Sequence, residues 1–133
     1  VKKSGCNMAK LVTFDFDDTL TLPRYDEEDE LWTTSLEPNK KTISALKKFA
    51  SSGYEVKIVT SRHGTSDHKK DIATFVRKHG LPVTDIIFTN GKWKADILDK
   101  LGSILHYDDD TWELSRIKNK KIKTIQVVHP MDK

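Results

Sequence analysis

The stretch that decides the fold is LVTFDFDDTLTLP, Leu11 to Pro23. It opens with an apolar run typical of a buried strand, and the carboxylates Asp15, Asp17 and Asp18 come directly behind that run. Acidic residues form strands poorly, and carboxylates held together raise one another's pKa. A cluster of this kind at the end of a buried strand therefore needs a nearby positive charge, which a divalent cation supplies.

Outward from that stretch, the chain alternates between strand-like and helix-like segments. Residues 20–37 have no helical period and are expected to form a loop or a small flap. Strands followed by helices in regular order predict an α/β fold, a three-layer α/β/α Rossmann-like arrangement with a central, mainly parallel five-stranded sheet. The expected strands are residues 10–16, 55–60, 85–89, 103–107 and 121–128, and the expected helices are 38–53, 66–79, 92–101 and 112–118.

Composition narrows the class of protein. The chain has 133 residues, a formal net charge of +3 and a pI near 8.9, which fit one domain that tolerates acidic or phosphorylated partners. Its single cysteine, Cys6, excludes an intrachain disulfide and is typical of a reducing compartment. Because no apolar run approaches the roughly 20 residues that span a bilayer, we expect a cytoplasmic protein with no membrane partner. Residues 1–7 are expected to be an added or disordered lead.

Acidic residues follow two of the predicted strands. Asp15 and Asp17 lie behind the first strand, and Asp108 and Asp109 lie behind the fourth. Because parallel strands bring their carboxyl ends to one edge of the sheet, these four carboxylates are expected to converge where α/β sheets bind ligands. A small set of hard oxygen ligands favours Mg²⁺. The pattern therefore predicts a magnesium site at this edge.

Four short motifs in the same order resemble the haloacid dehalogenase superfamily of phosphotransferases. DFDDT at 15–19 is similar to its DxDxT signature, and IVTSR at 58–62 is similar to its second motif. A lysine ahead of the fourth strand, Lys94 or Lys92, matches the third motif, and ILHYDD at 104–109 matches the fourth. The resemblance covers residues 10–128 and implies a single catalytic domain of haloacid-dehalogenase-like fold, residues 8–133.

The resemblance implies a reaction in two displacements. Asp15 would attack phosphorus and form an aspartyl-phosphate. Asp17 would protonate the leaving oxygen and then deprotonate the attacking water. Mg²⁺ would be held by the Asp15 carboxylate, the Asp17 backbone carbonyl and Asp108, while Asp109 would bind it through water or orient Lys94.

The remaining motif residues would bind the phosphoryl group. Thr60 would donate a hydrogen bond to it, and Lys94 would place a positive charge beside it. Lys94 is preferred to Lys92 because it begins the segment KADIL at a helix start. Thr19 and Ser61 are expected to support substrate binding, Thr19 by fixing the acidic loop. Two roles of Arg62 stay open: it could bind a substrate phosphate through two parallel hydrogen bonds, or it could form a surface salt bridge.

The histidines, Asp110 and the tryptophans are not assigned to the reaction. The five histidines have no metal-ligand spacing, so no zinc site is predicted. Asp110 is expected to cap the helix that begins at Thr111. The tryptophans are expected to be packing or rim residues, with Trp32 and Trp93 the two placed to contact a base or another ring.

The short segments between the motifs predict that no cap domain covers the site. An open site suits a phosphate on a large substrate, such as a nucleic-acid end. Residues 60–80 and 106–127 resemble, more weakly, the phosphatase domain of polynucleotide kinase-phosphatases, although Asp18 stands where glycine is common there. We therefore expect a Mg²⁺-dependent phosphatase acting on nucleic-acid 3′-phosphate ends, nucleotides or another exposed phosphate. The alternatives are a small-molecule phosphatase or phosphotransferase, and a non-catalytic binding domain.

Overall fold

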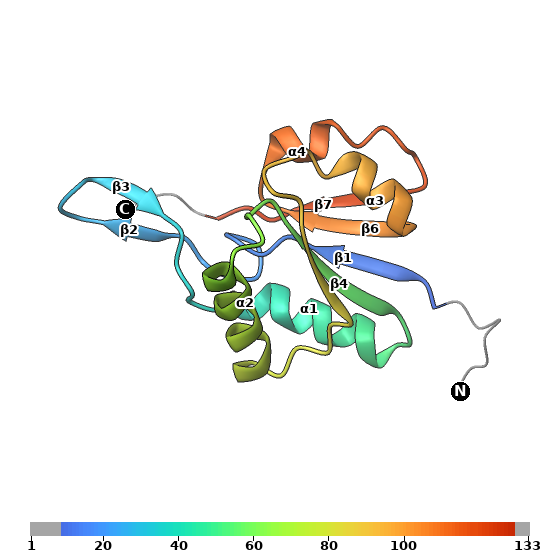
Figure 1. Ribbon diagram of the computed structural model, residues 1–133, viewed down its shortest axis with the longest axis horizontal. Coiled ribbons are helices and arrows are strands. Elements are labelled where there is room, and N and C mark those ends of the chain that lie inside the picture. Colours follow the sequence, from blue (N-terminus) through green and yellow to red (C-terminus); the bar gives the residue numbers. More distant parts are fainter. Residues whose placement is uncertain (1–8, 130–133) are drawn as a thin grey trace.

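The computed structural model describes residues 9–129, so the expected lead at residues 1–7 lies outside the described residues. Its centre is a five-stranded sheet in which every neighbouring pair is parallel. The strands are β1 (Leu11–Phe14), β4 (Glu55–Thr60), β5 (Asp85–Phe88), β6 (Ser103–Asp108) and β7 (Lys123–Gln126). They are ordered β5-β4-β1-β6-β7, with β1 in the middle (Figure 1). The predicted α/β class with a parallel five-stranded sheet is therefore confirmed.

Helices cover both faces of this sheet. The helices α1 (Lys40–Ser51) and α2 (Ser66–Lys78) lie on one face, and α3 (Ala95–Leu101) and α4 (Thr111–Ser115) lie on the other (Figure 1). The order of strands and helices is the predicted one, with ends shifted by some residues. The largest shifts are three residues, at the start of α3 and at the end of α4. The edge strand β7 is shorter than the predicted 121–128 by two residues at each end and is exposed along its length. No helix in the described part of the chain is long and apolar enough to cross a membrane.

The two helical layers enclose two separate apolar cores. Adjacent residues of a strand point to opposite faces, so Ile58 packs in the core beneath α1 and α2, and Val59 packs in the core beneath α3. All four residues of β1 are buried because both faces of the central strand are covered. This burial fixes where β1 ends, and therefore where the acidic residues behind it emerge.

A two-stranded hairpin occupies the predicted flap. The strands β2 (Arg24–Asp26) and β3 (Leu31–Thr33) pair antiparallel, and Tyr25 packs edge-on against Trp32. The hairpin is joined to the body of the protein by a bridge between Thr21 and Pro38. Strands of three residues are too short to produce a visible alternation in sequence, so the pattern predicts a flap without the hairpin.

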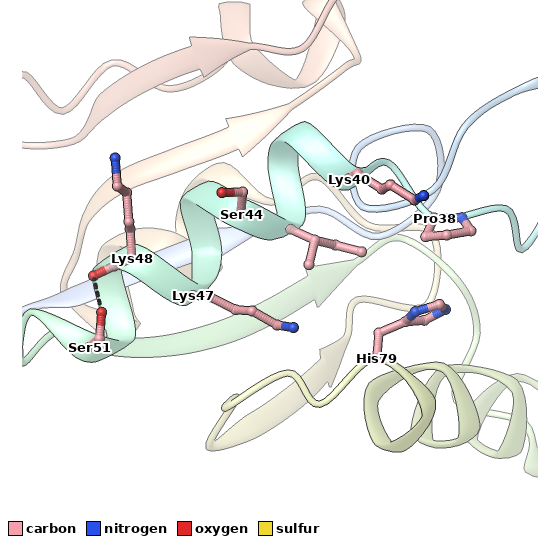
Figure 2. A pocket seen from close by; sticks show the side chains of 8 residues that line it. Pro38, Lys40, Ser44, Lys47, Lys48, Ser51 and His79 are labelled. Atoms are coloured by element: carbon pink, nitrogen blue, oxygen red, sulfur yellow. Dashed lines mark hydrogen bonds between the residues drawn. The ribbon is translucent and has the colours of Figure 1, made fainter.

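A hollow lies between α1 and the end of α2. Its volume is about 630 Å³, and Lys47 extends across it toward His79 at the end of α2 (Figure 2). None of its three lysines forms a salt bridge within residues 9–129. We call this hollow the lysine groove; it is lined by Pro38, Lys40, Ile43, Ser44, Lys47, Lys48, Ser51 and His79.

Candidate active site

A second hollow, of about 390 Å³, lies at the carboxyl ends of the central strands. It adjoins the end of β1, where the Asp15 backbone N–H donates to the Tyr107 carbonyl of β6 at 2.9 Å. This bond extends the pairing of β1 and β6 one residue beyond the strand and fixes the start of the acidic loop. We call this hollow the acidic site; it is lined by Asp15, Asp17, Asp18, Ser61, Lys94, Asp108, Asp109, Asp110, Thr111 and Glu113.

A buried lysine joins two of the carboxylates. The Lys94 Nζ donates to Asp15 Oδ1 at 2.8 Å and to Asp108 Oδ2 at 2.7 Å. Only 2% of the Lys94 side chain is exposed, and the Asp108 side chain is fully buried. Burial alone lowers the pKa of Lys94, but the charges of Asp15 and Asp108 outweigh burial and raise it above its ordinary value. Lys94 is therefore a fixed positive charge between two carboxylates.

Asp15 has a different environment from Asp108. Burial raises the pKa of Asp15 well above its ordinary value, and the charge of Asp108 raises it further, although Lys94 opposes both effects. At Asp108, burial also raises the pKa, but hydrogen bonds and charges from His106 and Lys94 outweigh it and lower the pKa overall. Asp108 is thus held ionised by its neighbours. At Asp15 the charge of Lys94 is too small to offset the effect of burial on the pKa.

The acidic loop holds the second oxygen of Asp15. The Thr19 hydroxyl donates to Asp15 Oδ2 at 2.9 Å, so both oxygens of this carboxylate are fixed. The backbone of Asp18 has a φ of +62°, a left-handed conformation that aspartate tolerates better than most residues. The Asp18 N–H donates to the Thr21 hydroxyl at 2.9 Å, which closes the loop. Thr19 therefore orients Asp15 from within the same turn.

Asp17 is held by Arg62. The Arg62 Nε donates to Asp17 Oδ2 at 2.8 Å, and its Nη2 donates to Asp17 Oδ1 at 2.7 Å. The guanidinium also lies over the Phe16 ring, 5.4 Å from its centre. Of the two readings of Arg62, this structure contains the salt bridge, with Asp17 as the partner. The pair joins the end of β4 to the acidic loop.

The other residues of the second and third motifs lie around the same edge. Thr60 is buried at the end of β4, where its hydroxyl accepts a hydrogen bond from the Arg62 N–H at 3.2 Å. Ser61 lines the acidic site. Lys94 lies between the two carboxylates, whereas Lys92 is exposed. The backbone N–H of Lys94 donates to Glu113 Oε1 at 3.0 Å, which fixes the start of α3 against α4.

A chain of buried hydrogen bonds reaches the site from beneath. The Thr13 hydroxyl is 2.8 Å from Ser103 Oγ and 2.8 Å from His106 Nδ1, and His106 Nε2 is 2.8 Å from Asp108 Oδ2. Metal-ligand spacing does not reveal this role of His106. Its position two residues before Asp108 on one strand is the available signal, because that spacing places both side chains on one face.

The acidic cluster fits a divalent cation. Carboxylate oxygens of Asp15, Asp108 and Asp109 lie within 4.8 Å of one another. Burial raises the pKa of Asp109, and the charge of Asp108 raises it as well. Hard oxygen donors with room for water suit Mg²⁺. The Asp17 side chain points to Arg62 instead, and Asp110 caps α4 by accepting from the Trp112 N–H at 2.8 Å.

The fold and the site together define a three-layer α/β protein of Rossmann type, with an acidic cluster and a buried lysine at the carboxyl edge of its sheet. No family model matches the chain, and no curated protein matches it.

Solved structures do match. A chain of the Pnkp1/Rnl/Hen1 complex has a TM-score of 0.65 and 15% identity over 95% of this chain and 48% of that chain, which shows a shared fold. The hypothetical protein XCC2798 from Xanthomonas campestris has a TM-score of 0.47 and 24% identity over 80% of this chain and 58% of that chain. The 3-deoxy-D-manno-octulosonate 8-phosphate phosphatase from Moraxella catarrhalis, solved with magnesium, phosphate and KDO, has a TM-score of 0.47 and 21% identity over 80% of this chain and 61% of that chain.

Proposed function

We propose that this protein is a Mg²⁺-dependent phosphomonoester hydrolase that acts through an aspartyl-phosphate on Asp15. The observation that carries the proposal is the contact of Asp15 with one buried lysine, Lys94, beside the carboxylates of Asp108 and Asp109. The carboxylate of Asp15 is fixed at both oxygens and lies beside the positive charge of Lys94. It is therefore suited to attack a phosphoryl group that Lys94 and a bound metal would hold. Solvated loop acids would not be buried or share a lysine.

The first displacement uses Asp15 and Asp17. An Asp15 carboxylate oxygen forms a bond to phosphorus as the bond from phosphorus to the leaving oxygen breaks. Asp17 gives a proton to that leaving oxygen. In the second displacement, water attacks the same phosphorus, Asp17 takes the proton of the water, and the Asp15 carboxylate is released with inorganic phosphate. Thr19 and Lys94 keep Asp15 aligned through both steps.

Asp15, Asp108, Asp109 and the backbone carbonyl of Asp17 are the residues that would hold Mg²⁺. The bound ion would neutralise phosphoryl oxygens and let an anionic nucleophile approach an anionic group. Thr60, Ser61 and Lys94 would donate hydrogen bonds to the phosphoryl oxygens.

Arg62 would act in two states. In the free protein its guanidinium donates two hydrogen bonds to the Asp17 carboxylate. A phosphate arriving at the site competes for the same guanidinium, because phosphate and carboxylate both accept its parallel N–H groups. Transfer of Arg62 to the substrate would release Asp17 to hold the proton that the leaving oxygen needs. This exchange reconciles the substrate-binding expectation for Arg62 with the observed salt bridge.

The substrate we propose carries its phosphate on an accessible end, such as a nucleic-acid terminus or a nucleotide. Between β1 and α1 the chain supplies only the β2–β3 hairpin, and between β4 and α3 only one helix and one strand. These short segments support an open site without a cap domain. The positive net charge of +3 agrees with an anionic substrate.

The test is Mg²⁺-dependent phosphate release from a panel of an aryl phosphate, 3′- and 5′-phosphorylated oligonucleotides, mononucleotides and sugar phosphates. Asp15→Asn should lower kcat at least about a thousandfold, because the amide oxygen is a poor nucleophile. Asp67→Asn, an exposed position on α2, is the matched control and should behave as wild type. Full activity of Asp15→Asn would exclude the mechanism. Absence of release from every substrate would favour a binding domain or a phosphotransferase with its own acceptor.

A further inference from the structure

Two tryptophans beside the acidic site are unusually exposed. Trp93 is 48% exposed and Trp112 is 71% exposed. Large aromatic side chains are normally well buried, and Trp32 in the hairpin packs on Tyr25. Exposing two such rings is unfavourable for an isolated protein, and exposed apolar groups gathered in one place mark binding surfaces.

Arg116 joins these two rings into one surface. Its guanidinium carbon lies 3.7 Å from the centre of the Trp93 ring. Trp112 is in α4, and Arg116 follows four residues later at the helix C-cap, still with helical backbone angles. Residues four apart lie on the same face of a helix, so Trp112 and Arg116 share one face. We call Trp93, Trp112 and Arg116 the aromatic patch.

Both tryptophans of the aromatic patch are sequence neighbours of residues that line the acidic site. Trp93 directly precedes Lys94, which contacts Asp15 and Asp108. Trp112 stands between Thr111 and Glu113, both of which line the acidic site. The two rings are therefore exposed within one residue of the rim of the acidic site along the chain, within reach of a large group that carries a phosphate into it.

Positive charge continues beyond the patch. Lys118, Lys120 and Lys121 follow Arg116 in the segment between α4 and β7, all are exposed, and none forms a salt bridge within residues 9–129. Aromatic faces on which bases stack, next to cations that track a phosphate backbone, are the combination that binds single-stranded nucleic acid. A small substrate without a ring, such as glycerol phosphate, has no face to stack on the tryptophans and would gain no affinity from the patch.

We propose that the aromatic patch binds the bases of a single-stranded nucleic acid whose terminal phosphate enters the acidic site. The entry of the phosphate rests on the proposed function, but the stacking of bases on Trp93 and Trp112 does not. Trp112 has the larger exposed face and provides the main stacking surface. Arg116 holds the Trp93 ring in place and faces the backbone phosphates.

The first experiment measures binding without any reaction. A fluorescently labelled single-stranded oligodeoxynucleotide with a 3′-hydroxyl is titrated with protein, without Mg²⁺, and its anisotropy is followed. One base–aromatic stack contributes about 1–3 kcal/mol, so Trp112→Ala should raise Kd about 5- to 150-fold and Trp93→Ala should raise it as well. Trp112→Phe keeps a π-face and should retain most of the affinity. Leu36→Ala, which truncates an apolar side chain 48% exposed outside the patch, is the matched control and should bind as wild type.

The second experiment compares substrates in the presence of Mg²⁺. In Trp112→Ala, the ratio of kcat/KM for a 3′-phosphorylated oligonucleotide to kcat/KM for glycerol phosphate should fall at least about fivefold, through KM. Circular dichroism and thermal unfolding confirm that each variant is folded. Both tryptophan variants are exposed substitutions and should unfold near the wild-type temperature.

The outcomes separate this inference from the proposed function. An oligonucleotide that does not bind, or that binds Trp112→Ala and Trp93→Ala as tightly as Leu36→Ala, would overturn the aromatic patch as a binding surface, even if phosphate is released. Oligonucleotide binding that depends on Trp112, with no phosphate release from any substrate, would support the patch and reject the hydrolase. A substrate ratio unchanged in Trp112→Ala would show that bound bases do not accompany the reacting phosphate, and would overturn the link.

Discussion

The lysine groove and the acidic site are two hollows of opposite charge, and they differ in volume, in the exposure of their lysines and in the contacts that these lysines make. The groove is the larger, about 630 Å³ against about 390 Å³. Its lysines are exposed and form no salt bridge within residues 9–129, and Lys47 and Lys48 point to different sides of α1 (Figure 2). Lys94 in the acidic site is 2% exposed and contacts two carboxylates. Buried, mutually bonded charges therefore mark the chemical site better than volume does.

The difference arises from how many parts of the chain meet in each place. All but one of the residues that line the lysine groove belong to α1 or, as Pro38, come just before its N-cap. Its lysines project from a single helix and remain exposed to solvent. The acidic site gathers side chains from the ends of β1, β4 and β6 and from the starts of α3 and α4. Only the carboxyl edge of a parallel sheet brings so many segments together.

The sharpest test of this comparison exchanges one lysine in each hollow for methionine. Lys94→Met leaves Asp15 and Asp108 without their shared cation, and removing one member of a buried ionic group typically costs about 3–5 kcal/mol of unfolding free energy. Lys47→Met in the groove should change it by less than about 0.5 kcal/mol. Urea denaturation of both variants measures the difference. Equal effects would mean that burial of Lys94 has no energetic consequence.

The next largest expected effect is stabilisation of the protein by Mg²⁺, which should depend on the acidic site and not on the lysine groove. An ion that binds only the folded protein stabilises it by about 2.7 kcal/mol at a hundred times its Kd. We expect thermal unfolding of the wild type to shift upward with Mg²⁺ and to return when a chelator is added. Asp108→Asn should lose this shift, while Lys47→Met should keep it. A shift that survives in Asp108→Asn would place the ion elsewhere.

Arg62 sharpens the comparison within the acidic site. Unlike the groove lysines, it makes two charge-assisted hydrogen bonds, to Asp17. Bonds of this kind contribute about 1.5–3 kcal/mol, so Arg62→Ala should lower kcat/KM about 10- to 150-fold. Because Arg62 would meet both the substrate phosphate and Asp17, KM should rise and kcat should fall. A fall in kcat with KM unchanged would reject a contact with the phosphate.

Asp18 carries the smallest predicted effect, on the pH dependence of stability. Burial, with the charges of Asp109 and Asp17, raises the pKa of Asp18 from 3.8 to about 6. The folded protein therefore binds this proton more tightly than the unfolded chain, and the contribution of Asp18 to stability falls as pH rises from about 4 to about 6. Asp18→Asn tolerates the same left-handed backbone and should remove that part of the pH dependence. Thermal unfolding at pH 5 and pH 8 in a chelator measures it, and identical pH profiles would contradict the shift.

Much of the fold follows from local patterns in the sequence. The apolar run before Asp15 and the run EVKIVT before Ser61 are strong enough to fix two central strands, and the acids behind the strands mark the edge that carries the site. The cap at Asp110 is likewise local, because its side chain bonds the next turn of its own chain. The β2–β3 hairpin is hidden because each strand has three residues.

Local patterns in the sequence do not show which side chains pair when they are far apart along the chain. Arg62 and Asp17 are 45 positions apart, and nothing in either segment indicates that they meet. The helix start at KADIL favours Lys94 over Lys92, and the structure buries Lys94 and exposes Lys92, but the contacts of Lys94 with Asp15 and Asp108 depend on packing that the local sequence does not show. The bonding of His106 to Thr13 depends on the register of β6 on β1, in which those two residues are partners.

The separation of Asp15 from Lys94 along the chain also bears on how the protein folds. The two residues are 79 positions apart, and Asp108 belongs to a strand that comes later still. Contacts between such distant segments form slowly, because much loop entropy is lost before they are made. Carboxylates on β1 and β6 would approach and repel one another in any intermediate that has not yet placed Lys94. We therefore expect folding to accelerate in the presence of cations that screen this repulsion, with the charged edge of the sheet assembling last.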